Sequence, residues 1–303
     1  MIMSFQVICF GEVLWDNLNS GKRIGGAPLN VCYHLGKQGI KSEIISKIGS
    51  DTNGEEILKE LKRLNVSSKF CFVDHVKPTS VVEVYLGNEN QVEYDIVEDV
   101  AWDYIEFTSP LGDIVANSDM LVFGSLATRS NMSFKTLCKL IDKSSYKVFD
   151  VNMRPPYHFK ENILTLMSNT DLLKLNLEEL KIISDWFGDT SLNVDTCIEK
   201  LLNRFLNIKE IILTKGSNGA AFYSVKEKIE VSAYNVIVKD TIGSGDSFLA
   251  AFLANKLKGT SIKTALLQAS LLSGFVTASN GACPDYTTEI LESFKNEMNK
   301  NTF

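Results

Sequence analysis

The chain has 303 residues, of which 45% are hydrophobic and 22% are charged, and its formal net charge is −6. This length and composition suit an α/β fold with a substantial core, and we expect residues 1–303 to form a single domain. The acidic balance argues against a nucleic-acid partner, because proteins that bind nucleic acids favour a basic surface.

The cysteines and the N-terminal residues indicate where in the cell the protein is expected. The six cysteines are scattered and have no Cys-x-x-Cys spacing, which indicates neither a zinc site nor a redox pair. Residues 1–12 have no basic region and too short an apolar run for a signal peptide. No stretch approaches the roughly 20 apolar residues of a membrane helix, so we expect a cytoplasmic protein with no membrane partner.

The N-terminal part of the chain alternates between apolar runs and helical patterns. Residues 6–11 and 42–48 predict buried strands, and residues 28–37 and 54–64 have the spacing of helices. Such an alternation of strand and helix implies right-handed crossovers and a parallel sheet.

Glycines and polar residues lie between the first strand and the first helix. Gly25 and Gly26 would let the backbone approach a small ligand, and Asp16 and Asn30 could form hydrogen bonds with polyol hydroxyl groups. The structural alternatives are a plain strand–helix turn, a solvated loop acid and a surface helix residue. The sequence leaves both interpretations open.

Residues 70–100 interrupt this alternation. They contain β-rich segments without an intervening helix, and residues 87–90 fit a hairpin turn. We therefore expect segments of about residues 13–25 and 70–100 to form a small antiparallel sheet that projects from the main domain. An edge hairpin packed on the core is the alternative. The β-rich segments are 70–73, 80–86 and 91–96.

The alternation resumes after residue 100. Open α/β sheets place their chemistry at the ends of strands, and polar residues follow several strands here. Arg154 lies just past one strand, where its guanidinium could bind sugar oxygens or phosphate, or form a structural salt bridge. Asn176 and Glu179 follow the next strand, where a helix cap is the simplest interpretation. Strands are expected at 120–123, 147–151, 172–175 and 211–213, and helices at 132–143, 177–186, 195–206, 261–278 and 288–298.

The stretch from Asp240 to Asp246, with the sequence DTIGSGD, leads directly into an apolar helical run at 247–257. We therefore expect a helix to begin near Asp246. A glycine-rich turn at a helix N-terminus favours an anion, because unpaired N–H groups and the macrodipole point at it. A carboxylate there would be useful if Asp246 deprotonated a hydroxyl group that accepts a phosphoryl group. The alternative is that Asp246 is only a helix cap.

This stretch resembles the second signature of the ribokinase-like (PfkB-type) carbohydrate kinases, Asp-Thr-x-Gly-x-Gly-Asp. Gly25-Gly26-x-x-x-Asn30 is similar to the first signature of that family, and the strand end Asp150–Arg154 resembles the fructokinases in particular. The resemblance implies a ribokinase-like α/β fold, a doubly wound, mainly parallel sheet flanked by helices, with a small antiparallel β-lid. In the family this lid covers the sugar and often forms the dimer contact, which implies a homodimer.

The resemblance also implies roles for individual residues. Asp246 would be the general base, and Gly243, Ser244 and Gly245 would form the anion hole, although the family most often has Ala in place of Ser244. Residues 214–219 would bind nucleotide phosphates, but they also fit an ordinary hairpin turn. The residues implied to bind the sugar are Asp16, Gly25, Gly26, Asn30 and Arg154. The residues implied to bind ATP are Asn176, Thr214, Gly216, Gly219 and Thr241.

Two ions are associated with such a site. The resemblance implies Mg²⁺ held through water by Asn176 and Glu179, and Mg²⁺ needs few carboxylates because it keeps several of its waters. It also implies a monovalent cation such as K⁺ near Asp240, although the sequence does not decide whether this chain has that site. The neighbouring Lys239 has no assigned role.

The expected activity is transfer of the γ-phosphoryl group of ATP to a hydroxyl group of a small sugar, with fructose favoured by the neighbourhood of Arg154. Ribose, 2-keto-3-deoxygluconate or a nucleoside would use the same turn. A sugar sensor that kept the pocket and lost turnover is an alternative of another class. A nicotinamide dehydrogenase is disfavoured, because no Gly-x-Gly-x-x-Gly turn follows the first strand.

Overall fold

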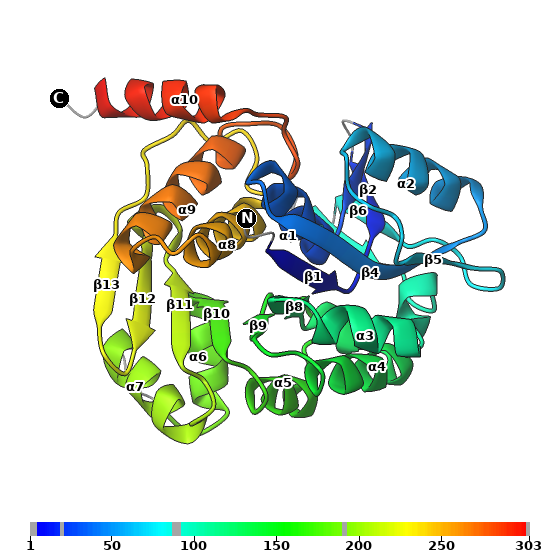
Figure 1. Cartoon of the computed structure of the whole chain (residues 1–303), viewed down its shortest axis with the longest axis horizontal. Helices are drawn as coiled ribbons and strands as arrows, with labels where there is room; N and C mark the ends of the chain where they lie inside the picture. Colours follow the sequence, from blue (N-terminus) through cyan, green and yellow to red (C-terminus); the bar gives the residue numbers. More distant parts are fainter. Residues whose placement is uncertain (1–4, 19–20, 87–91, 190–192, 301–303) are drawn as a thin grey trace. The chain divides into compact units, whose positions relative to one another are not determined.

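The computed structural model describes residues 5–18, 21–86, 92–189 and 193–300 (Figure 1). It divides into two compact units, which comprise residues 1–36 with 40–145 (the first unit) and residues 37–39 with 146–303 (the second unit). Each unit contains parallel strands and helices, and the first unit also holds a small separate sheet. The predicted fold class, a mainly parallel sheet flanked by helices with a small additional sheet, is confirmed.

The first unit is built on four parallel strands. In β1 the side chains from Val7 to Phe10 are fully buried, as is typical of a strand covered on both faces. The strands are β1 (Gln6–Phe10), β4 (Lys41–Gly49), β5 (Cys71–Asp74) and β8 (Met120–Gly124), in the order β8-β1-β4-β5. The helices are α1 (Ala27–Lys37), α2 (Thr52–Arg63), α3 (Ser109–Ala116) and α4 (Asn131–Ile141), with 3₁₀ turns at Ala101–Tyr104 and Leu126–Thr128.

The position of β5 corrects the expectation that residues 70–73 belong to the small sheet. This strand pairs in parallel with β4, so that Ile48 lies opposite Val73. The helix α2 lies between the two strands along the chain and supplies the crossover that a parallel pairing requires. The prediction is wrong because it considers only the strands that follow residues 70–73 and not the helix that precedes them.

The small sheet consists of two antiparallel strand pairs. Its strands are β2 (Leu14–Leu18), β3 (Gly21–Gly25), β6 (Val81–Leu86) and β7 (Val92–Ile96), in the order β3-β2-β6-β7. The pairings β2–β3 and β6–β7 are antiparallel as expected, but β2 and β6 pair in parallel. The sheet is therefore mixed, because the two pairs join through their first strands and these run in the same direction. The predicted turn at residues 87–90 lies outside the described residues.

The strands of the second unit lie in sequence order, from β13 to β9 across the sheet. The first three along the chain are parallel, and the last two continue the sheet as antiparallel neighbours. They are β9 (Lys147–Asp150), β10 (Leu172–Asn176), β11 (Glu210–Thr214), β12 (Ala220–Ser224) and β13 (Lys228–Val231).

The helices of the second unit include a packed pair, α8 (Ser244–Leu257) with α9 (Ile262–Thr277), that lies beside the strands (Figure 1). The helix α8 begins two residues before Asp246, close to the predicted position. The other helices are α5 (Lys160–Met167), α6 (Leu177–Asp185), α7 (Val194–Arg204) and α10 (Thr288–Lys300), with a 3₁₀ turn at Gly216–Asn218. In the part of the chain that the structure describes, no helix combines the length and the apolar character needed to cross a bilayer.

Candidate active site

The first unit holds four of the predicted site residues, Asp16, Gly25, Gly26 and Asn30, which we name the Asp16 group. Asp16 lies in β2, and a Cβ atom added at Gly25 would lie 2.3 Å from its Oδ2 atom. Gly26 has φ +117°, and a Cβ atom there would lie 2.3 Å from the carbonyl oxygen of Glu12. Position 26 therefore requires glycine, because any side chain would collide with the backbone, whereas a side chain at position 25 would displace the carboxylate of Asp16.

The turn between β3 and α1 is supported by Glu12, which the sequence does not single out. Glu12 is 4% exposed, and its carboxylate accepts a hydrogen bond from the Ala27 N–H at 3.2 Å. The Asn30 N–H donates to the Gly26 carbonyl at 2.9 Å, and Asn30 is 3% exposed. The alternative that Asn30 is a surface helix residue is therefore wrong.

The DTIGSGD stretch forms a tight turn at the start of α8 in the second unit. Gly243 is the N-cap residue with φ +76°, and a Cβ atom there would lie 2.6 Å from the Cβ of Ala282. The carboxylate of Asp240 accepts hydrogen bonds from the N–H groups of Ile242 at 3.0 Å and Gly281 at 3.1 Å. The turn is therefore held tightly against residues 281–282.

The N-cap residue of α8 is Gly243, which has no side chain to cap the helix, and α3 and α5 also lack a side-chain cap at this position. Side chains do cap α2, α4, α7 and α9, and the capping residues are Asp51, Ser130, Asn193 and Ser261. Asp246 lies in the first turn of α8 and is 8% exposed. Its buried carboxyl group lies where the helix dipole favours negative charge.

Four buried charged residues of the second unit meet near this turn, and we name them the Asp246 cluster: Asp150, Lys174, Glu179 and Asp246. The Lys174 Nζ atom lies 2.8 Å from Oδ1 and 2.6 Å from Oδ2 of Asp150. It would also lie 3.4 Å from a Cβ atom at Gly245. The sequence indicates the strand end after Asp150 but gives no sign of Lys174, which stands alone in the apolar run Leu172–Leu175.

The charges in the Asp246 cluster affect one another strongly. Burial by itself would lower the pKa of Lys174, but the hydrogen-bonded carboxylate of Asp150 outweighs it, and the pKa is raised. Burial raises the pKa of Glu179, and the negative charge of Asp150 adds to this effect. Three carboxyl groups and one ammonium group therefore share a region from which water is largely excluded.

Asn176 and Glu179 form a reciprocal cap at the start of α6. The Asn176 side chain accepts a hydrogen bond from the Glu179 N–H at 2.9 Å, and the Glu179 carboxylate accepts one from the Asn176 N–H at 2.8 Å. A second N–H group, that of Met153, donates to the other Glu179 oxygen at 2.8 Å. The simple interpretation of this sequence pattern, a helix cap, is confirmed.

The donor set at Glu179 is compatible with a hard cation bound through water. The described residues contain no group of three or more His, Cys, Asp or Glu side chains arranged to bind a metal directly. Mg²⁺ usually keeps several waters and binds few protein carboxylates. Carboxylate and amide oxygens at Glu179 and Asn176, beside the excess of carboxyl groups in the Asp246 cluster, are ligands of the kind that it prefers.

Arg154 and residues 214–219 also lie in the second unit. Arg154 is exposed and donates to the Met153 carbonyl at 3.2 Å, and it forms no salt bridge with a described residue. Thr214 ends β11, and residues 215–219 connect it to the antiparallel β12, so the hairpin interpretation is confirmed. Gly216 and Gly219 have φ +56° and +92°, a backbone conformation that favours glycine.

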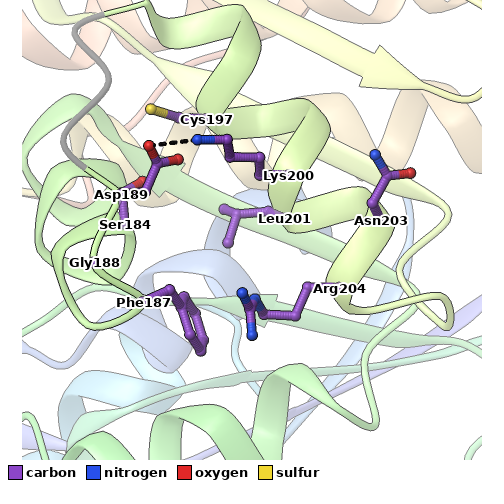
Figure 2. Close-up of a pocket in the computed structure, with 9 residues that line it drawn as sticks. All are labelled: Ser184, Phe187, Gly188, Asp189, Cys197, Lys200, Leu201, Asn203 and Arg204. Carbon is purple, nitrogen blue, oxygen red and sulfur yellow. Dashed lines mark hydrogen bonds and ion pairs between the residues drawn. The ribbon is translucent and has the colours of Figure 1, made fainter.

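A separate cavity of about 520 Å³ lies between α6 and α7, and none of the predicted site residues lines it. Figure 2 shows its charged residues, which are engaged with their neighbours. Lys200 forms an ion pair with Asp189 at 2.7 Å, and the Arg204 guanidinium lies 4.0 Å from the centre of the Phe187 ring. This cavity is therefore distinct from the Asp246 cluster.

The turn at Asp246 and the Asp16 group carry the two signatures of a known family, and a comparison with family models tests whether the chain belongs to it. The model described as pfkB family carbohydrate kinase matches residues 4–289. The chain belongs to the pfkB family of carbohydrate kinases. It is therefore a phosphotransferase that acts on an alcohol group, and the prediction of this family and reaction class is confirmed.

Relatives of this pfkB kinase include an uncharacterized sugar kinase from Pyrococcus horikoshii, 31% identical over an alignment of 269 residues that covers 86% of this chain and 83% of that protein. The fructokinase of Rhizobium leguminosarum bv. trifolii is 30% identical and covers 88% of this chain and 84% of its own length.

Two solved structures define the fold of the family. The crystal structure of the Pyrococcus protein superposes with a TM-score of 0.79 at 27% identity, and covers 97% of this chain and 99% of its own. The fructokinase of Xylella fastidiosa with bound ATP has a TM-score of 0.82 at 17% identity, with 98% and 100% covered. The ribokinase-like fold of this pfkB kinase is therefore confirmed.

Proposed function

We propose that the chain transfers the γ-phosphoryl group of ATP to a hydroxyl group of a small sugar, and that fructose is the favoured sugar. The observation that carries this proposal is the turn Gly243–Asp246, which joins a helix N-terminus with glycine at the N-cap to a buried carboxyl group. The fructokinase among the relatives supports the choice of sugar, and the Pyrococcus kinase in complex with ATP supports the nucleotide.

The transfer step requires a base and a site for negative charge. Asp246 accepts the proton of the sugar hydroxyl group as the hydroxyl oxygen forms a bond to the γ-phosphorus. The bond between the γ-phosphorus and the bridging oxygen of the β-phosphate breaks at the same time, which releases ADP. The N–H groups of Gly243, Ser244 and Gly245 stabilise the charge on the moving phosphoryl group. Most of the rate enhancement comes from this positioning and electrostatic stabilisation, because phosphoryl transfer needs little covalent chemistry from the protein.

Residues of the second unit would hold the nucleotide and its ions. Asn176 and Glu179 would hold Mg²⁺ through water, and the ion would supply positive charge to offset that of the phosphates. Asp240 would lie beside a monovalent cation such as K⁺, and its carboxylate is already oriented by two N–H groups. The residues assigned to the nucleotide are Asn176, Thr214, Gly216, Gly219 and Thr241.

The Asp16 group and Arg154 would bind the sugar. Asp16 accepts hydrogen bonds from sugar hydroxyl groups, and the close approach at Gly25 orients its carboxylate. The cytoplasmic location, the homodimer through the small sheet and the organisation as one domain stay predictions from the sequence. So does the role of the small sheet as a lid, without residues 70–73, which belong to the large sheet.

The experiment that tests the proposal measures ADP release from Mg-ATP with fructose, ribose, 2-keto-3-deoxygluconate and a nucleoside, and uses Asp246→Asn as the blank. Turnover with fructose that disappears in the blank would support both the reaction and the base. Turnover with another compound would retain the reaction and exclude fructose. No turnover with any compound, together with intact sugar binding, would favour the sugar sensor.

A further inference from the structure

The lysine in the middle of β10 is an unusual residue for its place. Leu172, Leu173 and Leu175 are fully buried, and Lys174 between them is 6% exposed. An ammonium group in such surroundings costs several kcal/mol unless a carboxylate and hydrogen bonds compensate it. A leucine or methionine would fill the same space without this cost, so the retained charge requires an explanation.

The tertiary structure gives Lys174 a dedicated partner. Asp150 lies opposite Lys174 in the parallel pairing of β9 with β10, and both carboxylate oxygens contact the ammonium group, at 2.8 Å and 2.6 Å. The two side chains are 8% and 7% exposed. The Val151 N–H also donates to the Lys174 carbonyl at 2.9 Å, so the backbones of the two residues are tied together.

The ammonium group of Lys174 lies against the turn that begins α8. A Cβ atom at Gly245 would lie 3.4 Å from its Nζ atom and 3.9 Å from its Cε atom. An added Cβ would meet the lysine at an ordinary van der Waals distance, so the turn lies beside the ammonium group. Asp246 in the same turn is buried as well, at 8% exposed.

We propose that Lys174, held by Asp150, is a positioning residue for the turn Gly243–Asp246. This inference rests on the proposed function, because it assigns the turn to phosphoryl transfer. Lys174 acts through Gly245, beside which its ammonium group lies. In a region with little water, its positive charge beside Gly245 favours negative charge at the turn and holds the backbone of the turn in place.

The test uses a double variant, because a single change would leave one charge buried without its partner and would unfold many molecules. Lys174→Met with Asp150→Asn removes both charges and keeps similar side-chain volumes. The matched control is Lys256→Met with Glu210→Gln, which removes another ion pair of 2.7 Å in the second unit, with side chains 21% and 18% exposed. Lys256 lies in the last turn of α8, at the opposite end from Gly245.

Two readouts separate positioning from a merely structural role. In turnover with Mg-ATP and the preferred sugar, the double variant should have a kcat roughly 100-fold lower, with each KM within about threefold of wild type. In hydrogen exchange without ligand, the N–H groups of residues 243–247 should exchange several-fold faster in the double variant. The control variant should match wild type in both readouts.

A folded double variant with wild-type kcat and wild-type exchange at residues 243–247 would overturn the inference and leave the pair a structural one. A thermal unfolding midpoint close to that of the control variant shows that the double variant is folded. If wild type itself shows no turnover with any sugar, the proposed function fails. The exchange readout then still decides whether Lys174 positions the turn, because it requires neither nucleotide nor sugar.

Discussion

In the Asp16 group, the backbone at Gly25 lies against the carboxylate of Asp16. In the second unit, the backbone at Gly243 lies against Ala282, and the carboxylate of Asp246 comes from the first turn of α8. Asp16 is half-buried, and Asp246 is 8% exposed among other buried charges. A half-buried carboxylate can exchange water for sugar hydroxyl groups, while a buried one alters the energy of a proton transfer. We therefore expect changes in the Asp16 group to affect KM and changes around Asp246 to affect kcat.

The largest effect is expected for Asp246→Asn, which removes the base and keeps the size of the side chain. The kcat should fall roughly 1,000-fold, because a positioned general base contributes about 100- to 10,000-fold. Sugar binding, measured by calorimetry, should be retained. A kcat within tenfold of wild type would remove the base assignment and with it the contrast between the two groups.

Gly243→Ala tests whether the turn needs its exact backbone path. The change forces alanine into φ +76° and places its Cβ 2.8 Å from the Cα of Ala282, so the turn must move, and kcat should fall roughly 100-fold. The matched control is Gly259→Ala, because Gly259 follows the other end of α8 with φ +74° and has no atom within 4 Å of an added Cβ.

The control variant separates the effect of backbone strain from the effect of moving the turn away from Ala282. Gly259→Ala should lower the free energy of unfolding by about 1 kcal/mol and leave kcat unchanged, since only the strain of the positive φ is present. Chemical denaturation and turnover of both variants measure the two effects. Equal kcat values in the two variants would show that contact with Ala282 is unimportant for the turn.

Asp16→Ala tests whether the Asp16 group binds the sugar without taking part in the transfer step. Loss of hydrogen bonds to a charged group, worth about 1.5–3 kcal/mol, should raise the KM for the sugar roughly 30-fold. The kcat and the KM for ATP should stay within about threefold of wild type, because Asp16 has no part in the transfer step. A fall in kcat with an unchanged KM would contradict the division of roles.

The smallest effect is expected for Asp74→Asn, a carboxylate outside both groups. Burial alone would raise the pKa of Asp74, but the hydrogen bond from Lys47 and the N–H groups of Lys77 and Val76 lower it from 3.8 to about 2. A folded-state pKa below the unfolded value stabilises the protein above about pH 4, and this contribution is lost as the pH falls towards 2.

Asp74→Asn should therefore lower the free energy of unfolding at pH 7 by about 1 kcal/mol, less than full conversion of the pKa shift because solvent screens the pair. The difference from wild type should shrink at pH 3, and kcat should not change. Urea denaturation at the two pH values measures the effect. A difference that grows as the pH falls would show that the assigned sign is wrong.

Local patterns account for most of what can be predicted from this sequence. Apolar runs bounded by glycine identify the parallel strands, and the Asn176–Glu179 cap follows from a hydrogen-bonding pattern within four residues. The glycine-rich turn before the apolar run of α8 is visible for the same reason. Such features depend on neighbours along the chain, so they can be read without the fold.

The main errors concern pairing between distant segments. The assignment of residues 70–73 is wrong, and the join between β2 and β6 is parallel, because strand partners depend on how crossovers place strands side by side. The role of Glu12 is also hidden, since its contact with the Ala27 N–H spans 15 residues.

The sequence by itself determined the family, the reaction class and the turn that carries the candidate base, because these depend on residue types at short spacings. Only the tertiary structure decided that Lys174 is buried against Asp150 and Gly245. Its partner lies 24 residues away on a neighbouring strand, and the turn lies on a helix that follows three further strands. In the sequence, one lysine in an apolar run gives no sign of whether its side chain is exposed or buried. In the fold the charge is buried, and because such burial is costly, a role for the charge is expected.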